Sequence, residues 1–204
     1  MKIFCIDKNY TQQGKSQNPI LYMKPETALT REDWPFFVPD WSQQVECEAH
    51  LAIRINHLGK SIPVRFAHRY YDEITVGLSF VARDVQNQLK ASGLPWEIST
   101  GFDGASYVGR WIKLSEINVQ HKDGEDLPSI TFTASLNGEQ QMEGYSKNMQ
   151  HAIDEIISYV SQYYLLKTGD IIFTGAPASF GPLHESDLIT ASLAGSEVLQ
   201  CRCK

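Results

Sequence analysis

The stretch Val45–Ile55 most constrains the fold, because polar and apolar residues alternate along it. Its odd positions are apolar or small, whereas Glu46, Glu48, His50 and Arg54 at even positions are charged or ionisable. A period of two predicts a half-buried β-strand whose polar side chains share one face. Such a face can be solvated, salt-bridged or one wall of a divalent-cation site. The spacing alone favours the solvated face, because short motifs often match by chance.

A second β-rich run, Ile74–Phe80, follows and then changes its period. Val81, Val85 and Leu89 recur at four-residue spacing, and Gly93 is placed to end the pattern. This spacing predicts an amphipathic helix directly after a strand. Junctions of this kind commonly hold ligands, because a helix N-terminus supplies free amide donors and a favourable dipole.

Other segments support the prediction of a mostly β, mixed α+β fold. Asn137-Gly138 predicts a tight hairpin turn, and Ala194-Gly195-Ser196 predicts the final one. Ser146 is expected to cap a second helix that ends by Gly169, and Asp170–Thr174 is expected to be a strand. The absence of βαβ regularity or repeats favours a single α+β domain over a parallel-sheet fold.

Charge and hydropathy exclude several classes of partner. A net charge of −6 without a basic run argues against non-specific nucleic-acid binding, which needs clustered Lys and Arg. No run of about eighteen apolar residues could cross a membrane. The apolar start of the chain is too short and too soon charged for a signal peptide, so we expect a cytoplasmic protein. Cys5 and Cys47 are expected to be buried, and Cys201 and Cys203 to be same-face strand residues rather than a metal site.

Several motifs occur in a specific order along the chain. Glu48 lies within a strand, and it is followed by Ala82-Arg83-Asp84-Val85-Gln86, by Gly101-Phe102-Asp103 with Gly109-Arg110-Trp111, and by the run from Gly169 to Pro177 with Gly181-Pro182. Their order and spacing resemble the fumarylacetoacetate hydrolase family. The resemblance covers nearly the whole chain, from Asn9 to about Asp187.

This resemblance implies a fold, a partner and a chemistry. The fold is a mixed β-sandwich roll with two main helices, in which residues 1–40 supply an N-terminal strand and lid segment and residues 41–204 form the catalytic-type β-roll. Family members are usually homodimers, and the aromatic stretch Trp34–Phe37 is a plausible dimer contact. Members use Mg²⁺ or Mn²⁺ to hydrolyse, decarboxylate or isomerise small diketo and oxo acids, because the metal stabilises the enolate.

Carried over residue by residue, the family's metal positions fall on Glu48, His50 and Ser79. Only Glu48 keeps a carboxylate, so two negative charges that favour Mg²⁺ are missing. His50 with Glu48, and with Glu46 if the strand slips or twists, could instead suit a borderline metal such as Zn²⁺ or Mn²⁺. The sequence therefore leaves open whether a divalent metal binds weakly, is absent or is replaced by Zn²⁺.

The family's catalytic positions are also substituted. Its lysine falls on Thr100, and the histidine and glutamate of its water-activating dyad fall on Gln13 and Ser16. The positions that face the substrate are Arg83, Gln86 and Thr174.

Arg83 offers a planar fork for the carboxylate of a small acid, and its alternative role is a structural salt bridge with Asp84 or Asp103. Two functions follow from these positions. One is an enzyme of this family with weak or altered activity on a small carboxylic or diketo acid. The other is an inactive paralogue that acts as a dimeric binding or structural partner.

Overall fold

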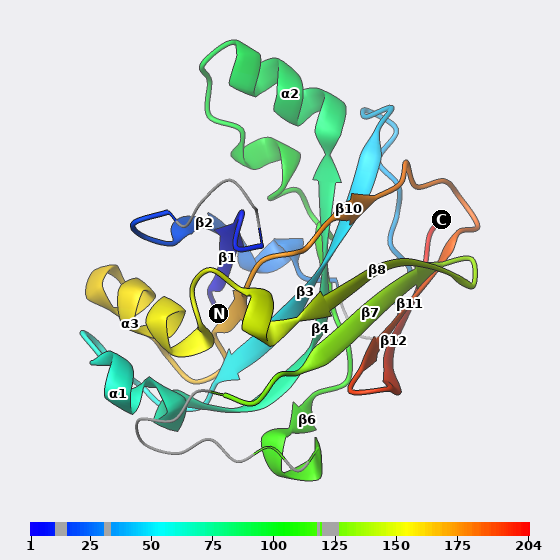
Figure 1. The fold of residues 1–204 in the computed structure, drawn as a ribbon. Coiled ribbons are helices and arrows are strands. Elements are labelled where there is room, and N and C mark those ends of the chain that lie inside the picture. The colour runs from blue at the N-terminus through cyan, green and yellow to red at the C-terminus, as the bar shows by residue number, and fades with distance from the viewer. Residues whose placement is uncertain (11–15, 31–33, 118, 120–126) are drawn as a thin grey trace.

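The computed structural model describes residues 1–10, 16–30, 34–117, 119 and 127–204. Its strands form a larger and a smaller sheet, and the helices lie at the edges of the molecule (Figure 1). The strands of the larger sheet are β1 (Ile3–Asp7), β2 (Ile20–Lys24), β3 (Val45–Ile55), β4 (Tyr71–Ala82), β5 (Ser106–Val108), β6 (Ile112–Lys113), β9 (Ile171–Phe173) and β10 (Ser179–Phe180). Those of the smaller sheet are β7 (Thr131–Leu136), β8 (Glu139–Tyr145), β11 (Leu188–Leu193) and β12 (Ser196–Arg202).

The larger sheet curls until its two ends meet. Its strands run in the order β2-β1-β9-β3-β4-β5, with β10 pairing β3 and β6 pairing β4. β1 and β9 are parallel, and the other pairs are antiparallel. Leu29, just beyond β2, forms a β-bridge with Ser106 of β5, which lies at the opposite end of the strand order. One face of β3 and β4 is therefore enclosed inside a roll.

The smaller sheet, in the order β12-β11-β7-β8, confirms both expected hairpins. Asn137 and Gly138 have φ angles of 53° and 85°, and Ala194 and Gly195 have φ angles of 48° and 81°. Asn and Gly tolerate this left-handed region best, which is why the Asn-Gly pair was a reliable signal. The confirmed fold class is mostly β with a sandwich of two sheets.

Three α-helices occur among the described residues: α1 (Val64–Ala67), α2 (Arg83–Ala91) and α3 (Ile153–Tyr163). The expected helix after β4 exists, but β4 continues to Ala82, so the helix begins at Arg83. The helix expected to start at Ser146 begins later, at Ile153, and only a single 3-10 turn occupies Ser146–Asn148. The intervening backbone is fixed outside a helix by Asn9, whose carbonyl and side chain accept the N–H groups of Gln150 and His151.

All four cysteines are buried and free, which confirms the burial expected for Cys5 and Cys47. Burial raises the pKa of Cys5 and Cys201 to about 11 and that of Cys203 to about 12, and it raises the pKa of Cys47 well above its ordinary value. These thiols therefore stay protonated near neutral pH and serve as small packing groups.

The aromatic stretch near the N-terminus is partly on the surface. Phe36 is buried and stacks on Phe80 with ring centroids 3.6 Å apart, whereas Trp34 and Phe37 are exposed. The homodimer expected through this stretch stays a prediction.

Within the described residues, no helix combines the length and the apolar character needed to cross a membrane.

Candidate functional site

The polar face of β3 is salt-bridged rather than freely solvated: Glu46, Glu48 and Arg54 are partly exposed and ion-paired, and His50 is buried. Glu48 pairs with Ser79 on β4 and with Ser179 on β10, and Ser79 pairs with Ser106 on β5. Directly opposite residues of an antiparallel ladder project from the same face. These side chains therefore form one row across four strands, and His50 follows in the next row with only 1% of its surface exposed.

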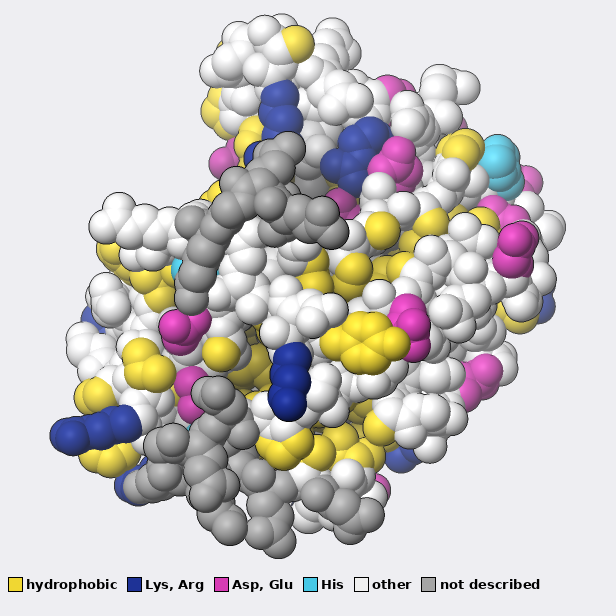
Figure 2. All heavy atoms as spheres, viewed as in Figure 1, with side chains coloured by type: hydrophobic (Ala, Val, Ile, Leu, Met, Phe, Trp, Pro, Cys, Tyr) yellow, Lys and Arg dark blue, Asp and Glu magenta, His cyan; other side chains and the backbone are white. Residues whose placement is uncertain are grey.

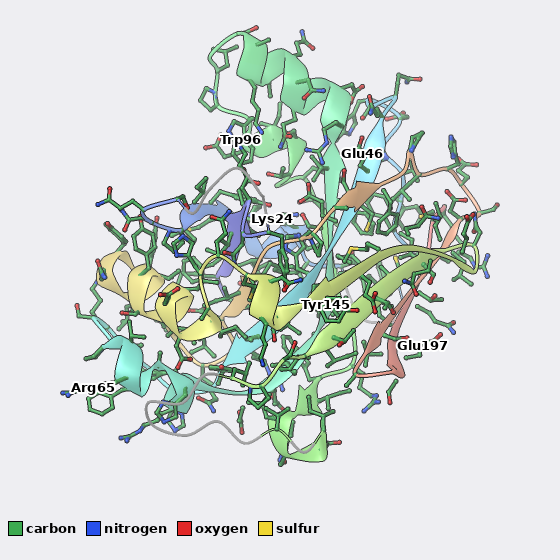
Figure 3. All side chains as sticks on the ribbon, in the orientation of Figure 1. Lys24, Glu46, Arg65, Trp96, Tyr145 and Glu197 are labelled. Atoms are coloured by element: carbon green, nitrogen blue, oxygen red, sulfur yellow. The ribbon has the colours of Figure 1, made fainter. Side chains whose placement is uncertain are left out.

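Arg83, the first residue of α2, ties this row to the helix. Its guanidinium donates to Glu46 through Nε (2.8 Å), to Glu48 through Nη2 (2.8 Å) and to Gln86 through Nη1 (2.7 Å). The alternative salt bridges with Asp84 and Asp103 are not the ones formed. Figure 2 shows basic and acidic side chains side by side at the base of α2, and Figure 3 places Glu46 at that end of β3.

These contacts set the charge state of the carboxylates. Burial alone would raise the pKa of Glu48, but its contacts with His50 and Arg83 outweigh burial and bring that pKa down to about 2. The pKa of Glu46 is also lowered, because hydrogen bonds from Arg83 and Ser179 outweigh its burial. Both side chains are therefore carboxylates near neutral pH.

Lys24, at the end of β2, extends its ammonium into the roll. Its Nζ donates to the hydroxyl of Ser79 (2.9 Å) and to the carbonyl of Ala105 (2.8 Å), and only 2% of the residue is exposed. Figure 3 shows Lys24 near the centre of the molecule. Burial lowers the pKa of Lys24, and the negative charge of Glu48 opposes that change. Lysine is rarely buried to this extent, so this ammonium is an unusual feature of the roll.

His50 is fixed by the turn after β9. The backbone N–H of Gly175 donates to its Nδ1 (3.1 Å), and the ring packs edge-to-face on Phe173 with centroids 5.4 Å apart. Since Nδ1 accepts this hydrogen bond, the ring proton lies on Nε2. That nitrogen lies 3.7 Å from the Glu48 carboxylate and is without a hydrogen-bond partner in the described part of the chain.

A second polar cluster surrounds Asn9. Its side-chain nitrogen donates to the carbonyls of His151 (3.0 Å) and Thr174 (2.7 Å), and its oxygen accepts the His151 N–H (2.8 Å). The Nε2 of His151 lies 3.1 Å from the hydroxyl of Ser16, and its Nδ1 lies 3.8 Å from a carboxylate oxygen of Glu155. The structure thus places a histidine against Ser16, one of the two expected dyad positions.

The remaining expected site residues have local contacts or lie outside the described residues. Gln13 falls outside them. Thr100 is buried, and its hydroxyl donates to the carbonyl of Glu97 (3.3 Å). The Thr174 hydroxyl donates to the carbonyl of Leu51 (2.8 Å), which fixes the start of the turn that carries Gly175.

The three expected metal positions do not fit a divalent cation. Glu48 is engaged by Arg83, and Ser79 accepts a hydrogen bond from the Lys24 ammonium. The proton on Nε2 of His50 would have to move before that nitrogen could bind a metal, which would break the hydrogen bond from Gly175. Among the described residues, no three His, Cys, Asp or Glu side chains gather in a way that could hold a metal ion.

Sequence reasoning missed Lys24, Asn9 and His151. Lys24 ends a short apolar run before Pro25, where a charged residue is ordinary, so periodicity gave no signal. Its partner Ser79 lies 55 positions away, and only the closure of the roll brings the two together. His151 lay within the helix expected after Ser146, and nothing in the sequence linked it to Ser16.

Comparison with known proteins identifies the family of this chain. The model of the fumarylacetoacetate (FAA) hydrolase C-terminal domain matches residues 2–203. The mitochondrial oxaloacetate tautomerase of Mus musculus is 31% identical over 208 residues, which cover 99% of this chain and 91% of that protein. Oxaloacetate tautomerase YcgM of Escherichia coli (strain K12) is 31% identical over 200 residues, which cover 95% of this chain and 89% of that protein.

A similar fold occurs in the crystal structure of fumarylpyruvate hydrolase from Pseudomonas aeruginosa in complex with Mn²⁺ and pyruvate. Its TM-score is 0.87 at 22% identity, and the match covers 100% of this chain and 89% of that one. The family match spans almost the whole chain, and the two tautomerases agree with it over nearly their full length. This protein therefore belongs to the fumarylacetoacetate hydrolase family.

Proposed function

We propose that the protein binds a small oxo dicarboxylic acid inside the roll and interconverts its keto and enol forms. Two relatives that are 31% identical over almost the whole chain are oxaloacetate tautomerases. The inner face supplies what such an acid needs, namely the cationic groups of Lys24 and Arg83 together with the amide of Gln86. Cationic groups and amide donors orient a bound carboxylate through charge-assisted hydrogen bonds.

Tautomerisation needs a group that moves a proton between carbon and oxygen. Glu48 is a poor base, because its pKa of about 2 makes it weakly basic. His151 is the better candidate, since imidazole most often transfers protons near neutral pH. The observation that carries the proposal is the 3.1 Å contact between His151 and Ser16, which supplies a histidine where the family's dyad is otherwise substituted.

The test is the conversion of enol to keto oxaloacetate, followed by ultraviolet absorbance. Wild-type protein should accelerate it above the buffer rate, and His151→Gln should lower that acceleration by about 100-fold or more, the usual contribution of general acid–base catalysis. His184→Gln is the matched control, because its side chain is exposed. Equal rates for wild type and His151→Gln would contradict the assignment of His151, and no acceleration by wild type would contradict the activity.

A second candidate is a family member that binds acids without turning them over. It is favoured by Arg83, whose three nitrogens all donate to groups of the protein itself. It is also favoured by Thr100, if the family's lysine position falls there as the sequence resemblance implies. This candidate gains support if wild-type protein binds oxalate but leaves the tautomerisation rate unchanged.

A further inference from the structure

The inner face around Glu48 holds more hydrogen-bond donors than its described neighbours use. A lysine ammonium has three protons, and Ser79 and Ala105 accept two of those of Lys24. The Nε2–H of His50 and the hydroxyl of Ser106 are buried without a partner in the described part of the chain. Ser106 lies beside Ser79 in the same row. A buried donor without an acceptor is costly, so its presence in a site indicates a ligand that accepts hydrogen bonds.

The charges of this face already balance. Glu46 and Glu48 contribute two negative charges, and Lys24 and Arg83 contribute two positive charges. A divalent cation would add two positive charges next to a buried ammonium, and there is no additional carboxylate at His50 or Ser79 to compensate them. A small anion would add negative charge beside Glu48, but it would accept hydrogen bonds from the ammonium and from the unpartnered donors, which a cation cannot do.

We propose that this face is an anion site that works without a metal, in which the Lys24 ammonium and the Nε2–H of His50 replace the divalent cation of the family. The ligand class is a small carboxylate with a neighbouring oxo or enolate oxygen. One carboxylate oxygen accepts from Lys24, and the adjacent oxygen accepts from His50. The choice of an oxo acid rests on the proposed function, whereas the absence of a metal rests on the donors and charges of this chain.

The first measurement needs no variant. Wild-type protein treated with EDTA and dialysed is titrated with MnCl₂ by calorimetry, and in a second experiment with sodium oxalate in the continued presence of EDTA. We expect no stoichiometric Mn²⁺ binding and one oxalate per chain. Stoichiometric Mn²⁺ binding, or oxalate binding that requires Mn²⁺, would overturn the proposal.

Variants then test the two donors. Lys24→Met and His50→Phe should each weaken metal-free oxalate binding by about 10- to 100-fold, as expected for loss of a charged or buried hydrogen bond. Lys113→Met is the matched control, because Lys113 is exposed on β6. Thermal melting establishes that each variant is folded. Unchanged oxalate binding in folded Lys24→Met would overturn the role of the ammonium.

A gain-of-function variant tests the charge argument. His50→Glu combined with Ser79→Asp restores two carboxylates beside Glu48 and should create Mn²⁺ binding that wild type lacks. Failure of the folded double variant to bind Mn²⁺ would show that these two positions do not decide metal binding. All of these readouts are binding measurements, so a protein that binds oxalate but does not tautomerise oxaloacetate would disprove the proposed activity and leave this inference intact.

Discussion

The β3–β4 ladder and the β7–β11 ladder are both antiparallel, yet they bury their side chains differently. In β7 and β11, buried and partly exposed residues mostly alternate, so one face packs and the other meets solvent. In β3 and β4, most residues of both faces are buried, including His50 and Ser79. The difference teaches that alternation in sequence identifies a strand and its two faces, whereas the curl of the whole sheet decides whether the polar face is solvated.

The largest effect is expected from the packing face of the smaller sheet. Phe132 is 1% exposed, so Phe132→Ala should lower the free energy of unfolding by about 3–5 kcal/mol. Denaturant unfolding measures this change, and Thr133→Ala on the opposite face is the control. The ring of Phe132 packs on Tyr10, whereas that of His50 packs on Phe173, so oxalate binding by the folded fraction should not change. Weaker oxalate binding by the folded variant would show that packing in the β7–β11 ladder also affects the proposed site on the β3–β4 ladder.

Each sheet contains a glycine that packs against an aromatic ring, Gly77 on β4 and Gly144 on β8. A Cβ added at Gly77 would lie 2.3 Å from the ring of Phe173, and one added at Gly144 would lie 2.3 Å from the ring of Phe132. Gly77→Ala and Gly144→Ala should therefore each cost about 1–3 kcal/mol of stability through overpacking. Only Gly77→Ala should also weaken oxalate binding, because Phe173 packs on His50. Equal effects of the two variants on binding would contradict the proposed place of the site.

Arg83→Met tests how much the ion pairs on the polar face of β3 contribute to stability. The substitution leaves the carboxylates of Glu46 and Glu48 without their shared cation. Because these groups are partly exposed, the free energy of unfolding of the protein should fall by about 1–2 kcal/mol. Arg110→Met, at an exposed position, is the control. Adding Glu48→Gln to Arg83→Met should recover part of the loss in thermal unfolding, and an additive further loss would show that the two side chains do not interact.

The smallest effect concerns pH. The pKa of Glu48 is about 2 in the folded protein, below its ordinary value of 4.5, so its carboxylate stabilises the fold above about pH 4.5. That stabilisation is lost as the pH falls from 4.5 towards 2. Glu48→Gln should therefore flatten the decline of the melting temperature in this window, while Glu139→Gln on the exposed β8 edge should not. An unchanged decline of the melting temperature would show that the pKa of Glu48 is not lowered in the folded protein.

The sequence predicted the strands and the hairpin turns because these depend on local period and turn chemistry. It also placed Arg83 at the junction of a strand and a helix. The inward direction of Glu48 and the approach of Lys24 to Ser79 could not be predicted, since both depend on the bridge between Leu29 and β5 that closes the roll. The late start of α3 was missed for a similar reason, because Asn9 holds the preceding backbone from far away in the chain.

The four buried thiols can serve as probes of local opening of the structure. Cys5 lies on β1 and Cys47 on β3, next to the proposed site, whereas Cys201 and Cys203 lie at the end of the chain that closes the smaller sheet. A buried thiol reacts with an alkylating reagent only when its segment opens, so each labelling rate reports the opening of one segment. If the roll opens to admit its ligand, labelling of Cys5 and Cys47 should slow with oxalate, while Cys201 and Cys203 keep their own rate.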